Sequence, residues 1–219
     1  MWNEAMLRLL LRGIGETLYM TLGATLFAYL TGLPLGLLLV VSAPDGLAPC
    51  RPVYKTLDIL VNLTRSIPFL VLMISVIPFT RIIAGTSIGS TAAIVPLVLS
   101  AAPFVARLVE SSIREVDPGV VEAAQSMGAS VMQIVCKVLL PEAKPSLLSG
   151  AAIAVTTILG YSAMAGAVGG GGLGNIAISY GYNRYQSDIM LVTVILLILI
   201  VQLFQEIGTR ASRRTDKRR

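Results

Sequence analysis

Residues 169–174 are four glycines, a leucine and a glycine, and they match the G-x-G-x-x-G spacing with which dinucleotide-binding proteins hold a pyrophosphate. That chemistry needs a β-strand directly before the glycines, whereas a long apolar stretch without charges precedes them here. We interpret the run as a flexible turn at the outer mouth of a membrane protein, or as close helix packing across a subunit interface. The sequence contains no G-x-x-x-x-G-K-[ST] motif, so it has no P-loop for ATP.

Catalytic and metal chemistry are disfavoured by the residue types present. The 219 residues include no histidine, which removes the commonest general base and the usual zinc ligand. Cys50 and Cys136 lack C-x-x-C spacing, and we interpret both as free thiols. We therefore predict no catalytic residue, no metal site and no cofactor bound by this chain itself.

Composition places the chain in a membrane. It is 55% hydrophobic and only 13% charged, with a mean hydropathy of +0.79. The net charge of +5 arises largely from a basic tail, which predicts a cytoplasmic segment that contacts anionic lipid and not a nucleic-acid site. The basic residues of this tail are Arg210, Arg213, Arg214, Lys217, Arg218 and Arg219.

Apolar stretches long enough to cross a bilayer recur along the whole sequence, which predicts a single all-helical membrane domain over 1–219. Only Arg81 separates the second stretch from the third, which predicts a tight hairpin with this arginine at a membrane surface. The five predicted spans are approximately 18–41, 59–80, 82–106, 145–169 and 189–205.

The positive-inside rule orients these spans. With the basic tail inside and five spans, the N-terminus lies outside, and 13 of the 17 Lys and Arg residues then fall on the cytoplasmic side. We predict a multi-pass membrane protein with its N-terminus outside and its C-terminus in the cytoplasm.

One substantial polar segment, 107–144, interrupts the spans on the predicted cytoplasmic side, and it carries nine charged residues. Asp and Pro at 117–118 are typical of a helix start, and Gly128 of a helix end about three turns later. Residues 130–133 read as a capping box that starts a second helix, which Pro141 ends. The segment is predicted to be a helix-turn-helix at the membrane surface.

Glu122, Ala123 and Ala124 combine one acidic side chain with small ones, so another protein could approach the first of these helices closely. On spacing alone, a docking site and an ordinary helix lying against lipid headgroups have equal weight.

The series Glu-Ala-Ala at 122–124, then Gly128, and Leu-Pro at 140–141, resembles the EAA loop of ABC importer permeases, although Val138 stands where that pattern has isoleucine. The resemblance implies a type I importer fold in which this loop is the coupling helix of the permease. It implies that Glu122, Ala123, Ala124, Gly128 and Ala129 contact a cytoplasmic ATPase.

The resemblance covers nearly the whole chain, and the sequence is similar to the methionine branch of these permeases. This branch implies a location in the bacterial inner membrane. It implies a homodimer that works with cytoplasmic ABC ATPase subunits, which bind ATP and Mg²⁺, and with an external methionine-binding lipoprotein. The implied substrate is L-methionine, with the D-isomer left open. The segments that carry the likeness are 65–69, 77–81, 85–89, 101–104, 127–129, 137–143 and 160–164.

The fourth predicted span is the best candidate to line a translocation path, through Tyr161, Ser162 and Met164. Small neighbours would let two copies pack, and Met164 would narrow the path at the dimer axis. The alternative is that the hydroxyl groups of this span only bond back to helix carbonyls.

Two other functions remain open at this point. A gradient-driven carrier or channel for a small polar solute is weakened by the lack of Asp, Glu and His in the five predicted spans. A membrane scaffold that recruits some other partner would transport nothing.

Overall fold

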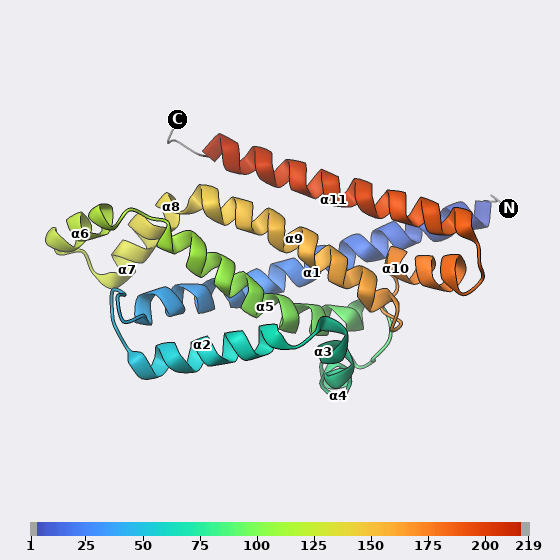
Figure 1. The fold of residues 1–219 in the computed structure, drawn as a ribbon, viewed down its shortest axis with the longest axis horizontal. Coiled ribbons are helices and arrows are strands. Elements are labelled where there is room, and N and C mark those ends of the chain that lie inside the picture. Colours follow the sequence, from blue (N-terminus) through green and yellow to red (C-terminus); the bar gives the residue numbers. More distant parts are fainter. Residues whose placement is uncertain (1–3, 216–219) are drawn as a thin grey trace.

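The computed structural model describes residues 4–215, and within that range it contains only helices and their connections. Long helices run side by side along the molecule, and the short helices α6 and α7 form one of its ends (Figure 1). This all-helical architecture is the predicted one. The elements are α1 (Glu4–Ser42), α2 (Arg51–Ser66), α3 (Phe69–Ser75), α4 (Ile77–Ala84), α5 (Ser90–Arg114), α6 (Pro118–Ser126), α7 (Val131–Ile134), the π-helix η1 (Val135–Leu139), α8 (Leu140–Glu142), α9 (Lys144–Gly166), α10 (Gly172–Ile176), the π-helix η2 (Ala177–Tyr182) and α11 (Ser187–Thr215).

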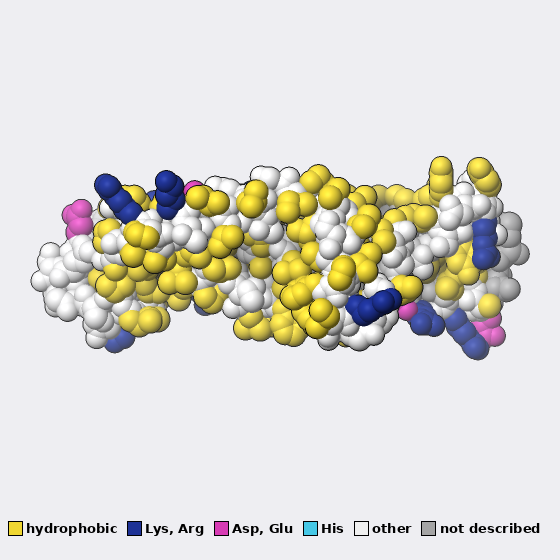
Figure 2. All heavy atoms as spheres, turned by 90° about the horizontal axis from the view of Figure 1, so that it is seen from below, with side chains coloured by type: hydrophobic (Ala, Val, Ile, Leu, Met, Phe, Trp, Pro, Cys, Tyr) yellow, Lys and Arg dark blue, Asp and Glu magenta, His cyan; other side chains and the backbone are white. Residues whose placement is uncertain are grey.

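Four of these helices, α1, α5, α9 and α11, are long and apolar enough to cross a membrane. Figure 2 shows apolar side chains over the middle of the molecule and most Lys and Arg side chains towards its two ends. That distribution is typical of a protein whose middle lies in hydrocarbon. Lys217, Arg218 and Arg219 of the predicted basic tail lie outside the described residues.

The predicted second span, 59–80, is not one helix. It is divided among α2, α3 and α4, and the axes of α2 and α3 meet at 101°. Ile67 is extended, with ψ 124°, because the residue before a proline is disfavoured in the helical conformation. Counting the bent pair as one crossing raises the number of spans to five.

The expected hairpin at Arg81 is also displaced. Arg81 lies in the last turn of α4, and the chain reverses after it, through Gly85 and Gly89. Their φ angles of +71° and +102° suit glycine and few other residues. Two glycines, and not the charged residue, therefore provide the turn.

Several helices extend beyond the predicted apolar stretches. The first begins at Glu4 and not near Leu18, and α5 runs from Ser90 to Arg114, so the predicted polar segment begins inside a helix. Hydropathy marks the part of a helix that suits lipid, whereas charged helix turns persist where side chains pair four residues apart. Such pairs join Arg8 to Glu4, Arg12 to Glu16 and Arg210 to Glu206.

Helices α1 and α5 approach each other closely at two glycines. A Cβ atom on Gly32 would lie 2.6 Å from the carbonyl oxygen of Ala102, and one on Gly36 would lie 2.5 Å from that of Ala106. The absence of a side chain lets the two backbones come together, as in small-xxx-small packing of membrane helices.

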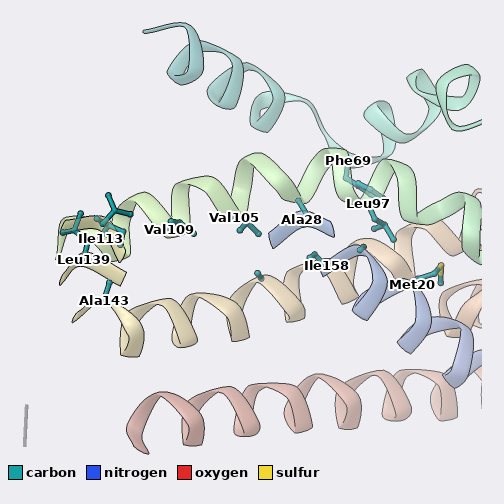
Figure 3. Packing of buried hydrophobic residues seen from close by; sticks show 14 of the residues in the cluster. Met20, Ala28, Phe69, Leu97, Val105, Val109, Ile113, Leu139, Ala143 and Ile158 are labelled. Atoms are coloured by element: carbon teal, nitrogen blue, oxygen red, sulfur yellow. The ribbon is translucent and has the colours of Figure 1, made fainter. Parts of the chain in front are cut away.

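The main buried apolar core extends from the middle of α1 and the first half of α5 to the short helices. Figure 3 shows it from Met20 and Leu97, through Val105 and Val109, to Leu139 and Ala143 beside the short helices. The membrane helices and the α6–α8 region therefore share one core.

The last turn of α11 is hydrogen-bonded to the beginning of α9. The Ser212 hydroxyl donates to the carbonyl oxygen of Pro145 at 2.8 Å, and the Ser149 hydroxyl donates to Ser212 at 2.8 Å. The end of α11 thus stabilises the corner between α8 and α9.

Candidate functional site

The segment that carries Glu122 has the local structure expected from the sequence. The Asp117 carboxylate accepts a hydrogen bond of 2.7 Å from the backbone N–H of Gly119 at the start of α6, and Pro118 occupies the first turn. Gly128 follows α6 with φ +78°, the left-handed conformation that ends helices. The predicted start and end of this helix are confirmed.

The predicted capping box is present at the second helix. The Ser130 side chain accepts from the backbone N–H of Gln133, and the Gln133 side chain accepts from the backbone N–H of Ser130 at 2.8 Å. The prediction that Pro141 ends this helix is wrong, because helical structure continues through η1 into α8. Pro141 lies within α8, directly after the π-helix η1.

A compact surface results from these two caps. Glu122 and Ala123 are exposed, and Met127 and Met132 are 81% and 70% exposed on either side of the Gly128 turn. We call Glu122, Ala123, Met127, Gly128 and Met132 the coupling surface. It offers one carboxylate, two flexible apolar side chains and an uncovered backbone turn, a combination suited to a protein groove.

Ala124 and Ala129 contribute differently from the other predicted coupling residues. Ala124 is only 5% exposed and belongs to the internal core with Ile134 and Leu139, and Ala129 is partly buried against that core. Ala124 therefore positions α6 and does not itself present a surface. The exposed methionines 127 and 132 were missed by the sequence reasoning, although apolar residues beside a charged turn are a usable signal.

A second group of charges lies along the last turns of α5. Arg107 forms an ion pair with Asp58 of α2, and its guanidinium donates to the side-chain oxygen of Asn62 at 2.9 Å. It also pairs with Glu110 at 2.5 Å, and the other carboxylate oxygen of Glu110 accepts from Arg114 at 3.2 Å. We call Arg107, Glu110 and Arg114 the charge ladder.

The ladder ends at the connection between α1 and α2. Arg114 donates to the Asp45 carboxylate at 3.0 Å. Hydrogen bonds from the backbone of Asp45 and from Arg114 hold the pKa of this carboxyl below its ordinary value of 3.8, so the pair stays charged at neutral pH. Because the folded-state pKa is lowered, its contribution is lost only as the pH falls through that lowered pKa.

The glycine run at the other end packs against its own chain. The backbone N–H of Gly172 donates to Glu16 at 2.8 Å, and that of Leu173 donates to the Thr17 hydroxyl at 2.9 Å. Gly169, Gly171 and Gly172 have positive φ angles, so a turn is present, as predicted. Glu16, which was not predicted from the sequence, joins this turn to α1 through its hydrogen bond with Gly172.

The three predicted path residues do not share one surface. Tyr161 stacks on Phe69 with ring centroids 4.8 Å apart, and Met164 is 48% exposed. Ser162 is 1% exposed, and its hydroxyl donates to the carbonyl oxygen of Leu159 at 2.8 Å. Ser162 thus faces the interior of the chain, as in the alternative of back-bonding hydroxyls, because helical spacing turns it away from Met164.

The structure gives no group of three or more His, Cys, Asp or Glu side chains within residues 4–215 that could hold a metal ion. Cys50 and Cys136 are exposed free thiols.

A family model matches most of this chain. The family is described as the binding-protein-dependent transport system inner membrane component, and its model matches residues 32–217. The chain belongs to this family. It is therefore a multi-pass inner-membrane component of a binding-protein-dependent transport system.

Two relatives and one solved structure are similar to three quarters or more of this chain. A probable D-methionine transport system permease protein MetI of Vibrio cholerae is 53% identical over 210 residues, which are 96% of this chain and 93% of that protein. The D-methionine transport system permease protein MetI of Escherichia coli K12 is 51% identical over 75% of this chain and 76% of its own length. A solved structure of inward-facing conformations of the MetNI methionine ABC transporter superposes with a TM-score of 0.97 at 49% identity, covering 99% of this chain and all of the other.

Proposed function

We propose that this inner-membrane component is the permease subunit of an ATP-driven ABC importer of methionine. The observation that carries the proposal is the coupling surface, which presents Glu122 and two exposed methionines at one end of an otherwise apolar bundle. Relatives about half identical to this chain are methionine permeases, and such identity over nearly all of both chains supports the same substrate.

The energy for transport comes from partner subunits in this proposal. The chain has no P-loop, so ATP and Mg²⁺ would be bound by cytoplasmic ATPase subunits seated on the coupling surface. A second copy of the chain completes the path across the membrane, and an external methionine-binding lipoprotein delivers the substrate. No residue of the chain carries out covalent chemistry.

The N-terminus lies outside and the C-terminus inside in this proposal. The beginning of α1 and the end of α11 are at opposite ends of the molecule, and α6 and α7 lie towards the same end as the end of α11 (Figure 1). This agrees with an odd number of crossings and with a cytoplasmic coupling surface.

Uptake of labelled methionine into vesicles that contain the chain, its ATPase and its binding protein tests the proposal. We expect uptake to need ATP and both partners, and Glu122→Lys to lower it about tenfold, because one reversed charge contact at an interface is worth about 1.4 kcal/mol or more. Glu4→Lys makes the same charge change at the start of α1, at the opposite end of the molecule from α6, and should leave uptake unchanged.

The rival functions give different results in the same vesicles. Uptake that follows an ion gradient without the ATPase would indicate a secondary carrier. No uptake of any amino acid, with the ATPase still bound, would indicate a scaffold.

Met164 is the path residue that this proposal retains, because its half-exposed side chain is free to narrow a path beside the second copy. We expect Met164→Ala to increase the leak of methionine from preloaded vesicles without ATP. Leu199→Ala, which shortens an exposed side chain on α11, serves as the control. Equal leak and equal uptake in Met164→Ala and wild type would contradict the role.

A further inference from the structure

We infer that the charge ladder on α5 carries movement of the coupling segment to α2, and that Arg107 and Glu110 are positioning residues for transport. The inference rests on the proposed function and adds a route by which ATPase movement reaches the membrane helices. The ladder lies between the coupling segment, which is firmly packed, and α2, which is lightly packed.

On one side, the ladder is continuous with the coupling segment. Arg114 is the last residue of α5, and α6 begins four residues later at Pro118. Ile113 and Val116 are buried in the same core as Ala124 and Leu139. A closely packed core transmits displacement, so movement of α6 carries the end of α5 with it.

On the other side, α2 is only lightly packed. Of its 16 described residues, Val61 alone is buried, where it meets Leu39 and Ala106. Tyr54 and Leu57 pack partly buried against the same cluster, and polar bridges from Arg107 to Asp58 and Asn62 add a second attachment between α2 and α5. Such an attachment is directional and can exchange partners, whereas a broad apolar contact cannot do so readily.

The ion pairs within the ladder can stay formed while α5 moves. The Glu110 side chain is 8% exposed and lies between Arg107 and Arg114, so each charge in the row has an opposite neighbour. Removing Glu110 would take the shared carboxylate from both arginines, which costs more at a partly buried site than at an exposed pair. The row thus acts as one unit that spans the last two turns of α5.

Beyond α2 the route continues to the candidate path. The sharp bend after Ser66 leads into α3, whose first residue is Phe69. The Phe69 ring stacks on Tyr161 of α9, with an angle of 6° between the ring planes. Movement of α2 is therefore transmitted through α3 to α9, close to Met164.

The test measures methionine imported per ATP hydrolysed by the reconstituted complex that contains Arg107→Gln. We expect ATP hydrolysis to stay within about twofold of wild type while methionine per ATP falls about fivefold or more, the size of a typical coupling between sites. Arg210→Gln, which breaks an ion pair on α11, is the matched control and should leave the ratio unchanged. The double variant Asp58→Asn/Arg107→Gln should lose no more than Arg107→Gln, because both changes break the same bridge.

Two outcomes would overturn the inference. One is an unchanged ratio in Arg107→Gln; the other is an equal fall in hydrolysis and import together with a lower unfolding temperature, which is the mark of a structural role only. Distances between spin labels at Leu63→Cys on α2 and Ile153→Cys on α9, with Cys50 and Cys136 replaced, give an independent readout. We expect an ATP-dependent change that Arg107→Gln abolishes, and this readout decides the inference even if wild type imports no methionine, the result that would sink the proposed function.

Discussion

Replacing Gly128 with valine should reduce ATP-driven methionine uptake at least about tenfold, because a β-branched residue held at positive φ carries strain of about 1–3 kcal/mol. Gly128 has φ +78° between α6 and α7, and no described atom lies within 4 Å of a Cβ built there. The effect would thus come from the backbone and not from a collision. The turn would relax to another conformation and separate Glu122 from Met132 on the coupling surface.

Gly128→Asn is the matched variant, since asparagine adopts the left-handed conformation far more readily than valine does. It should retain most of the uptake and most of the binding to the ATPase in co-purification. Equal uptake in the valine and asparagine variants would show that the turn conformation does not matter for coupling.

The second large effect is expected on folding, at the contact between α1 and α5. Gly36→Ala adds a methyl group 2.5 Å from the carbonyl oxygen of Ala106 and 2.7 Å from Cβ of Val109, both of which are held by their helix. Overpacking of this kind costs about 1–3 kcal/mol, against a gain of up to about 1 kcal/mol in helix propensity. We expect the unfolding temperature of the purified protein in detergent to fall by several degrees, and further in Gly36→Val.

Gly15→Ala makes the same chemical change in the same helix, where no described atom lies within 4 Å of the added carbon. Its unfolding temperature should equal or exceed that of wild type. A fall of the same size in both variants would place the effect in α1 itself and not in its packing against α5.

Features that depend on neighbouring residues could be predicted from the sequence. The cap at Asp117, the turn at Gly128 and the capping box at Ser130 each involve groups within three residues of one another, so their chemistry can be read directly. The apolar stretches likewise predict a helical membrane protein, because a helix is one of the few backbone structures that satisfies its polar groups in lipid.

Features that depend on distant residues could not be predicted. The spacing of Arg107, Glu110 and Arg114 places them on one helix face, but nothing local shows that Asp58 and Asp45 lie opposite. The bend at Pro68 is similar, since an apolar run through a proline fits either a kinked span or two separate helices.

The hydrogen bonds of Ser212 have a consequence for how the protein is made. Ser212 closes the corner between α8 and α9, and it is synthesised after every residue of the coupling surface. The coupling surface, although it is encoded near the middle of the chain, therefore reaches its final support only after α11 has been synthesised and inserted. A truncated or half-inserted chain would lack this support, so ATPase subunits would assemble preferentially on permeases whose insertion is complete.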